Sequence, residues 1–287
     1  MNNPTIIITG ANGFIGQELV KYFLDKNWNV KAFVRSIPEN KVKGLLYIVY
    51  NLTERPDEKA FESADFLVHC AYLRFEQNKD ADTINLTGTK SLIDLCRKNN
   101  VKPLFLSSFS AHERAQSHYG KTKLAAEKLF DLSKEVVLKP GFVIGKKGMA
   151  SELINTLRKS RFFPLIGGGK QPLQTIYIDD LCLIIETCFF KNLSGIFYVA
   201  DSQAITMKIF YKEISKQLNK KTIFIPFSLR LIYHLFSLTE RLGLKMPVYS
   251  ESVVGLKNLV SFETKRDLEK IGISLKNYCE SLESVLK

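Results

Sequence analysis

Cysteine is sparse in this chain of 287 residues, and its five occurrences lie far apart. Cys70, Cys96, Cys182, Cys188 and Cys279 lack the close paired spacing of a zinc site or of a disulfide framework. We therefore expect reduced thiols, no metal site and a cytoplasmic location. The sequence has no stretch apolar enough to span a membrane and no N-terminal segment typical of a signal peptide, so we expect a soluble protein.

The sequence also lacks a basic run interleaved with aromatic residues, although its formal net charge is +12. The lysines are spread along the chain, and for this reason we expect no nucleic-acid partner. Attraction of an anionic substrate or cofactor is the favoured use of the charge, and a lysine-rich background composition is the alternative. No internal repeat or low-complexity linker divides the chain.

Short apolar runs do alternate with amphipathic stretches in the first half of the chain, a pattern typical of strand-helix-strand units in a parallel sheet. The expected helices cover residues 15–26, 83–99 and 119–133. The expected strands cover residues 5–8, 28–35, 45–50, 64–70, 103–107 and 135–139. The alternation becomes irregular beyond about residue 145. We predict an α/β fold with a doubly wound parallel sheet and a smaller C-terminal subdomain.

A glycine-rich segment, Thr9-Gly10-Ala11-Asn12-Gly13-Phe14-Ile15-Gly16, follows the first expected strand and opens the first expected helix. In this context the spacing indicates a dinucleotide site. Gly10 permits a tight turn, Gly13 lets the backbone approach a pyrophosphate, and Gly16 lets the helix pack on the strand. A glycine turn without a ligand is the alternative. The residues assigned here to cofactor binding are Gly10, Asn12, Gly13, Phe14, Ile15 and Gly16.

Tyr119 and Lys123 are four residues apart in an expected helix, so they lie on the same helical face. A phenol has a pKa of about 10, and a neighbouring ammonium group favours its ionised form. The pair therefore indicates acid-base chemistry. Ser107 and Ser108 end the preceding strand, where a hydroxyl can polarise a carbonyl. The alternative is that the pair and the serines have no chemical role.

With these segments the chain resembles the short-chain dehydrogenase/reductase superfamily, and more closely its extended, epimerase/dehydratase-like branch. His69-Cys70-Ala71 is similar to the fourth-strand segment of that branch, Asn85 to its helix-kinking asparagine, and residues 176–181 to its late strand and helix start. The resemblance implies a Rossmann NAD(P)-binding domain at residues 1–145. It implies that residues 146–287 complete the sheet (about 172–200) and form a substrate-binding subdomain.

The resemblance also implies the roles of the site residues. Tyr119 would donate or accept a proton, Lys123 would lower the pKa of Tyr119 and hold the nicotinamide ribose, and Ser108 would bind the substrate oxygen. Ser107 and Ser110 are alternatives to Ser108. The other expected cofactor contacts are Arg35, Asn51, Leu52, Cys70, Ala71, Ser107, Tyr119, Lys123, Pro140, Gly141 and Val143. The expected substrate contacts are Tyr72, Ser110, Phe142 and Gln174.

Arg35 closes the second expected strand, where an acidic residue would hold the ribose hydroxyls of NAD. Because an arginine there can pair with a ribose 2′-phosphate, we prefer NADP over NAD. Asn51 stands where the family commonly has an adenine-contacting aspartate.

The expected function is an NADP-dependent reductase or dehydrogenase that interconverts a carbonyl and a secondary alcohol by hydride transfer. Phe142 and Leu173 replace an asparagine and an arginine that nucleotide-sugar enzymes often carry, which disfavours such a substrate. A nucleotide-sugar epimerase or 4-keto reductase of surface glycan synthesis is one alternative. A non-catalytic NADP(H)-binding accessory or sensor protein is another, which residues 173–177 resemble in part. The expected partner is a small carbonyl compound or sugar, and a homodimer is open.

Two further features leave alternatives open. Leu231, Leu235, Leu238 and Leu242 lie at helical spacing within residues 229–242. We expect this stripe to cover a core or an oligomer interface, and contact with a membrane surface is the alternative that we favour less. The loop before Tyr119 contains two histidines, His112 and His118, which we interpret as solvated loop residues, with a proton relay as the alternative.

Overall fold

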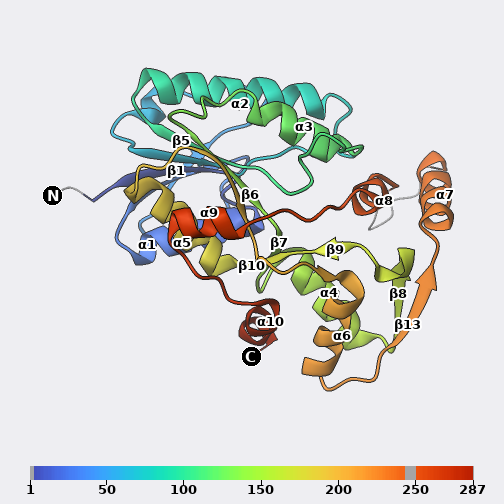
Figure 1. The fold of residues 1–287 in the computed structure, drawn as a ribbon. Coiled ribbons are helices and arrows are strands. Elements are labelled where there is room, and N and C mark those ends of the chain that lie inside the picture. The colour runs from blue at the N-terminus through green and yellow to red at the C-terminus, as the bar shows by residue number, and fades with distance from the viewer. Residues whose placement is uncertain (1–2, 243–249, 287) are drawn as a thin grey trace. The chain divides into compact units, whose positions relative to one another are not determined.

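A seven-stranded sheet is the largest sheet of the computed structural model, which describes residues 3–242 and 250–286 (Figure 1). The strand order is β11-β6-β5-β4-β1-β2-β3. The pairs from β6 to β3 are parallel, with Thr5 of β1 opposite Asn29 of β2 and Ile6 opposite Phe66 of β4. The strands are β1 (Thr5–Thr9), β2 (Asn29–Val34), β3 (Leu46–Val49), β4 (Phe66–His69), β5 (Lys102–Leu106), β6 (Val136–Pro140) and β11 (Gly195–Val199).

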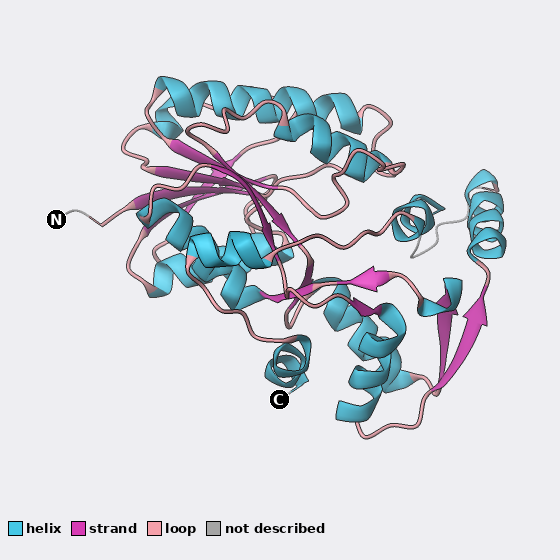
Figure 2. Ribbon diagram, viewed as in Figure 1, coloured by secondary structure: helices cyan, strands magenta, loops and turns pink. Residues whose placement is uncertain are grey.

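Helices cover both faces of this sheet, as Figure 2 shows. Helices α1 (Phe14–Asp25) and α5 (Ile178–Phe190) lie on one face, and α2 (Ala81–Lys98) lies on the other. The predicted doubly wound parallel fold is therefore confirmed. Because β1 pairs with β2 on one side and β4 on the other, the strand order reverses beside β1. Open α/β sheets bind ligands at the carboxyl ends of the strands at such a reversal.

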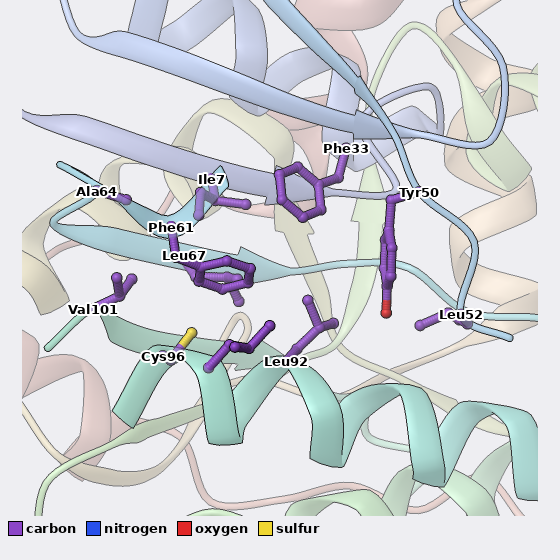
Figure 3. Close-up of a cluster of buried hydrophobic side chains, with 11 residues drawn as sticks. Ile7, Phe33, Tyr50, Leu52, Phe61, Ala64, Leu67, Leu92, Cys96 and Val101 are labelled. Atoms are coloured by element: carbon purple, nitrogen blue, oxygen red, sulfur yellow. The ribbon is translucent and has the colours of Figure 1, made fainter. Parts of the chain in front are cut away.

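The core under α2 is a cluster of apolar side chains from the sheet and the helix (Figure 3). Ile7 and Phe33 come from neighbouring strands, and Leu92 and Cys96 come from α2. Phe61, in the short helix η1 (Glu58–Phe61), packs edge to face on Phe33 with ring centroids 5.9 Å apart. Tyr50 and Leu52 lie at one end of the cluster, opposite Ala64 and Val101.

The core under α1 and α5 is more aromatic. Trp28 lies 4.5 Å from the ring of Phe23 in α1 and 5.7 Å from that of Phe190 in α5, measured between ring centroids. Phe66 of β4 stacks on Phe189 at 4.3 Å. Glu186 of α5 also accepts hydrogen bonds from Tyr22 and Lys26, which joins α1 to α5 through a half-buried ion pair.

The chain divides into two compact units that interleave along the sequence. The first comprises Met1–Ser107, Thr122–Lys139 and Leu181–Phe197, and the second comprises Ser108–Lys121, Pro140–Asp180 and Tyr198–Lys287. Strand β11 is thus contributed to the sheet from the region of residues 172–200, while the assignment of a cofactor domain and a substrate domain stays a prediction. Helix α3 (His118–Glu127) runs from the second unit into the first.

The second unit contains short sheets and helices. Strands β7 (Phe142–Ile144) and β10 (Thr175–Tyr177) pair in parallel, as do β8 (Phe162–Ile166) and β13 (Ile223–Phe227). Strands β9 (Pro172–Leu173) and β12 (Ile205–Thr206) pair antiparallel. The helices are α4 (Gly148–Lys159), η2 (Gly167–Gly169), α6 (Met207–Gln217), α7 (Leu229–Arg241), α8 (Ser250–Lys257), α9 (Lys265–Ile271) and α10 (Tyr278–Leu286).

The leucine stripe of α7 does not cover a core. Leu231, Leu235, Leu238 and Leu242 are 61%, 50%, 55% and 66% exposed. The core interpretation of this stripe is therefore wrong, and the oligomer and membrane interpretations remain. In the part of the chain that the structure describes, no helix has the length and hydropathy that crossing a membrane requires.

Candidate functional site

The turn between β1 and α1 requires glycine at two positions. Gly10 has a φ of +67°, and a Cβ on it would lie 2.9 Å from the Cα of Ala71. A Cβ on Gly16 would lie 2.3 Å from the carbonyl oxygen of Gly10. Neither position has room for a side chain. The backbone of β1, the turn and the first turn of α1 therefore pack against one another directly.

The N-terminus of α1 is suited to an anion. Gly13 caps the helix without a side-chain hydrogen bond, and the first turn of α1 contains no acidic residue. The amides of a first helical turn need acceptors, and the helix dipole favours negative charge there. Asn12 donates a hydrogen bond to the carbonyl oxygen of Ser36 at 2.9 Å, which ties the turn to the end of β2.

A pocket of about 440 Å³ opens beside this turn in the first unit. It brings together nine residues that the sequence analysis selected as contacts of a cofactor or substrate: Gly10, Asn12, Gly13, Arg35, Asn51, Leu52, Cys70, Ala71 and Tyr72. Phe33, Val34, Ser36, Tyr50 and Leu73 complete its described lining. Phe14, Ile15 and Gly16 lie next to the pocket in sequence, at the start of α1.

The chemistry of this lining fits a dinucleotide. Arg35 supplies a cation at the end of β2, and no acidic residue is among the described residues that line the pocket. Tyr50 is 6% exposed, and its hydroxyl has no hydrogen-bond partner within the described chain. Burial raises the pKa of Tyr50, so this hydroxyl keeps its proton. Because an unpaired buried hydroxyl costs free energy, a polar ligand atom in the pocket is a candidate partner.

His69, at the end of β4, organises the pocket wall through a buried chain of hydrogen bonds. Its Nδ1 lies 2.7 Å from Thr9 Oγ1, and its Nε2 lies 3.0 Å from Thr89 Oγ1. Thr9 Oγ1 already accepts bonds from the amides of Cys70 and Ala71, each at 3.2 Å. Its proton is therefore donated to His69 Nδ1.

The hydrogen bonds on the other side of the His69 ring have the same donor-to-acceptor order. Thr89 donates its hydroxyl proton to the carbonyl oxygen of Asn85 at 2.6 Å, so Thr89 Oγ1 accepts from His69 Nε2. Asn85 in turn accepts from the amide of Leu73 at 2.9 Å and donates to its carbonyl at 2.8 Å. His69 is thus a neutral Nε2–H tautomer, and burial lowers its pKa to about 3. The network fixes the backbone of the pocket wall from Cys70 to Leu73.

Lys123 is 4% exposed in the first unit. Its ammonium group donates to the carbonyl oxygen of Leu106 at 2.7 Å and lies 4.5 Å from the ring centroid of Phe105. The Tyr72 ring centroid is 5.4 Å away. Burial lowers the pKa of Lys123 to about 8, while Cys70 and Glu127 act in the opposite direction. The group therefore remains mostly protonated at neutral pH.

A buried ion pair, which was not predicted from the sequence, lies near Lys123. Lys139 of β6 contacts Glu127 of α3 at 2.9 Å, and their side chains are 2% and 5% exposed. Ser107 donates its hydroxyl proton to the same carboxylate. Two signals were present in the sequence: Glu127 follows Lys123 by one helical turn, and Lys139 interrupts an otherwise apolar strand. The hydroxyl of Ser107 is thereby committed to Glu127.

The second unit carries the other predicted site residues. Tyr119 is 37% exposed and lies one helical turn before Lys123 on α3. Ser108 accepts a hydrogen bond from the amide of Ser110 at 3.1 Å, an arrangement that leaves its hydroxyl proton to be donated. Gly120 packs so closely that a Cβ on it would lie 2.3 Å from the carbonyl oxygen of Ser110. The serine loop and the start of α3 are therefore held together.

The segment from Pro140 to Val143 and Gln174 lie together in the second unit. Gly141 donates to the carbonyl oxygen of Val199 at 3.1 Å, and Phe142 packs edge to face on Phe210 with centroids 5.7 Å apart. The side-chain amide of Gln174 donates through Nε2 to the carbonyl oxygens of Asp201 and Phe262 and accepts through Oε1 from the backbone amide of Phe262, at 2.8 to 3.0 Å. These bonds give Gln174 a structural role, and its substrate contact stays a prediction.

His112 differs from the predicted solvated loop residue. It is half-buried, its Nδ1 accepts from the amide of Arg114 at 3.2 Å, and its Nε2 donates to the carbonyl oxygen of Asn258 at 3.0 Å. The solvated interpretation of His112 is therefore wrong. Both ring nitrogens hold backbone, an arrangement that favours anchoring of the loop over proton transfer.

The glycine turn, the pocket and the strand order together describe a Rossmann site, and a family comparison agrees. A model of the NAD dependent epimerase/dehydratase family matches residues 6–192, well over half of the chain. The chain belongs to the NAD dependent epimerase/dehydratase family. The predicted membership of the extended short-chain dehydrogenase/reductase superfamily is thereby confirmed, as is the family-level prediction of an oxidoreductase or epimerase.

Relatives within this family have different substrates in their names. The chain is 27% identical to a UDP-glucose 4-epimerase of Vibrio cholerae, over 77% of this chain and 78% of that protein. It is 22% identical to a decarboxylating sterol-4-alpha-carboxylate 3-dehydrogenase of Dictyostelium discoideum, over 98% of this chain and 99% of that protein.

Among solved structures, a dTDP-4-dehydrorhamnose reductase of Bacillus anthracis in complex with NADP has the same fold. Its TM-score is 0.72 at 19% identity, and 99% of each chain is covered. Complexes with NAD also occur among the solved structures that share this fold. At these identities the similarity demonstrates the fold alone, and both forms of the cofactor are compatible with it.

The protonation of His69 predicts a specific pH dependence of stability. The unfolded chain takes up a proton at this histidine near pH 6.5, whereas the folded chain takes it up only near pH 3. The stabilisation that comes from keeping His69 neutral is thus fully present above pH 6.5 and is lost as the pH falls towards 3. At pH 5 the free energy of unfolding should be lower by about 2 kcal/mol. Denaturant unfolding at pH 7.5 and 5 measures the change.

His69→Gln should unfold with a smaller loss of stability between these two pH values. The matched control is His234→Gln, since His234 is exposed on α7. Equal pH dependence in the wild type and His69→Gln would contradict the neutral buried tautomer.

The buried ion pair predicts a second effect on stability. Lys139→Met leaves the Glu127 carboxylate buried without its cation, which should lower the free energy of unfolding by about 3–5 kcal/mol. Adding Glu127→Gln removes the unpaired charge and should restore part of that loss. Lys98→Met is the control, because the Lys98–Glu58 pair is 61% and 42% exposed and should contribute about 0–1 kcal/mol. A cost for Lys139→Met no larger than that of the control would exclude a stabilising role.

Proposed function

We propose that this protein is an NADP-dependent reductase or dehydrogenase that interconverts a carbonyl group and a secondary alcohol. The observation that carries the proposal is the pocket in which the glycine turn and Arg35 lie together. Bound NADPH would supply the hydride, and the protein would supply position and a proton. Family membership supports NAD(P) as the cofactor, and the choice of NADP rests on the pocket residues.

The phosphate-binding part of the proposal assigns three groups. The first-turn amides of α1, beside Gly13, would hold the pyrophosphate. The guanidinium group of Arg35 would pair with the 2′-phosphate of the adenosine ribose, since planar bidentate contact with phosphate is its strongest interaction. Asn51, which lines the same pocket, would contact the adenine as a neutral hydrogen-bonding group.

The chemical part of the proposal assigns Tyr119, Lys123 and Ser108. Tyr119 would give a proton to the carbonyl oxygen as hydride arrives at the carbonyl carbon, and would accept it in the reverse reaction. The protonated ammonium group of Lys123 would stabilise the tyrosinate that remains. Ser108, whose hydroxyl proton is left to be donated, would bind the same substrate oxygen and stabilise charge that develops there.

The second candidate is a nucleotide-sugar epimerase or 4-keto reductase. The similarity to the Vibrio cholerae UDP-glucose 4-epimerase favours it. Phe142 and Leu173 disfavour it, since both are apolar and Leu173 is buried in β9. Turnover of a UDP-sugar without added cofactor would identify the epimerase, whereas a requirement for NADPH would identify the reductase. A small carbonyl compound or sugar is the proposed substrate in either case.

Tyr119→Phe should separate binding from chemistry. The variant keeps the aromatic ring and removes the acidic proton, so NADPH affinity should be unchanged while turnover falls by about 10² to 10⁴. Calorimetry measures the affinity, and NADPH oxidation with a panel of carbonyl compounds measures turnover. Tyr233→Phe is a matched control, because Tyr233 is 40% exposed and lies outside the proposed site. Unchanged turnover in Tyr119→Phe would remove Tyr119 from the proposed mechanism.

Arg35→Asp should reverse the cofactor preference. A carboxylate repels the 2′-phosphate and can accept hydrogen bonds from the ribose hydroxyls of NAD. We expect NADPH affinity to fall by about ten- to a hundredfold while NADH affinity rises. Titration of both nucleotides by calorimetry tests this, with the exposed Arg266→Asp as a control for the change in net charge. An unaltered ratio of the two affinities would contradict the role of Arg35.

A further inference from the structure

The second unit exposes an apolar surface that the proposed reaction does not use. Leu231, Leu235 and Leu238 of α7 and its C-cap residue Leu242 recur every three or four residues, so they form one stripe along the helix, and each is at least half exposed. Packing against α8 uses other residues of α7, including Glu240, which accepts hydrogen bonds from the amide and hydroxyl of Ser250. The leucine stripe therefore faces solvent.

Strand β13 leads directly into α7 (Figure 1). The ribbon that β13 forms with β8 also exposes apolar side chains. Ile223 lies opposite Phe162, and Ile225 lies opposite Pro164. Because side chains alternate along a strand, these four residues share one face, and all four are exposed. Phe163 and Leu165 point to the other face and are buried. The ribbon thus buries the β8 side chains of one face and exposes the apolar side chains of the other.

The chain segments that carry this apolar surface have an excess of positive charge. The segments 153–178 and 214–239, which contain β8, β13 and most of α7, have no aspartate or glutamate. Their cations are Arg158, Lys159, Arg161, Lys170, Lys216, Lys220, Lys221 and Arg230. Arg161 and Phe162 are adjacent in the chain, and the amide of Ile223 bonds to the carbonyl oxygen of Arg161 at 2.8 Å. Exposed apolar groups and an excess of cations therefore occur in the same segments.

We propose that the leucine stripe of α7 and the outer face of the β8–β13 ribbon dock on an anionic lipid surface. An amphipathic helix with an aliphatic stripe and basic flanks lies in the interface of a membrane, where acyl chains take the apolar side chains and headgroups attract the cations. With 13 residues, α7 is too short to span a bilayer and fits a helix lying flat.

The charge of this surface favours an anionic membrane over a second copy of the chain as the partner. A twofold symmetric dimer through this surface would place the same basic segments of both copies against each other, which is unfavourable. An anionic membrane instead offers both the apolar contact and the opposite charge. This arrangement concerns the second unit alone and does not depend on the proposed reaction.

The test is co-sedimentation of the full chain with vesicles of phosphatidylcholine alone or with about one third phosphatidylglycerol. The wild type should bind the anionic vesicles, bind the neutral vesicles weakly, and dissociate in about 0.5 M NaCl, where screening is strong. The double variant Leu235→Glu/Leu238→Glu should lose at least about tenfold in partitioning, because two carboxylates replace exposed leucines at the docking face.

Leu46→Glu is the matched control, since Leu46 is 54% exposed on edge strand β3 of the first unit and should leave binding unchanged. Circular dichroism verifies that each variant is folded. Absence of binding to anionic vesicles at low salt, or equal binding by the wild type and the double variant, would overturn the proposal. A third contrary outcome combines two results: analytical ultracentrifugation shows a wild-type dimer that is absent in the double variant, and the wild type does not bind vesicles.

Discussion

The close approach of the Gly16 backbone to the carbonyl oxygen of Gly10 fixes where α1 begins relative to β1. A Cβ at either glycine would overlap backbone atoms, so the packing is possible only without side chains at these positions. This contact, together with the bond from Asn12 to Ser36, places the first-turn amides of α1 at the carboxyl ends of the strands. The pocket, its cation Arg35 and the proposed reaction all depend on that placement.

The wall of the same pocket is organised by neutral groups. The hydroxyl and ring protons of Thr9, His69 and Thr89 all point one way, from the end of β1 to the Asn85 carbonyl oxygen, and the Asn85 side chain both accepts from and donates to the backbone of Leu73. A histidine with ordinary pKa would disturb these hydrogen bonds each time it took up a proton. Burial prevents that, and the pocket keeps one geometry over the physiological pH range.

Much of the first unit could be predicted from the sequence because its strands are short apolar runs bounded by turn residues. Strand β1 and the glycine segment were found almost to the residue. Helix α3 was expected to reach residue 133 but ends at Glu127, where the Phe130 amide bonds to the Glu127 carbonyl oxygen at 3.2 Å in a turn. The next amide, that of Asp131, donates to the Glu135 carboxylate at 2.7 Å instead of continuing the helix. The contact between Asp131 and Glu135 depends on a side chain that follows the turn, so the helical periodicity of the sequence does not predict it.

The pocket lining could be predicted where a motif identified it, as for Gly13, Arg35 and Cys70. Tyr50 could not be predicted as a pocket residue, because an aromatic residue at the end of an apolar strand is typical of a hydrophobic core. Only the structure shows that its buried hydroxyl has no hydrogen-bond partner in the described chain. The exposure of the α7 leucines was likewise beyond reach. Periodicity defines a stripe on a helix, but tertiary packing decides whether another element covers it.

The interleaving of the two units has a consequence for how the protein is made. Strand β6 receives its outer neighbour β11 from far along the chain, and α5 supplies the buried Phe189, which stacks on Phe66 of β4. A nascent chain that has just left the ribosome through residue 145 still has an open sheet edge and lacks the Phe189 ring that covers Phe66. The seven-stranded sheet can therefore be completed only after roughly the next fifty residues have been synthesised. In that interval the incomplete sheet exposes apolar surface to which chaperones can bind.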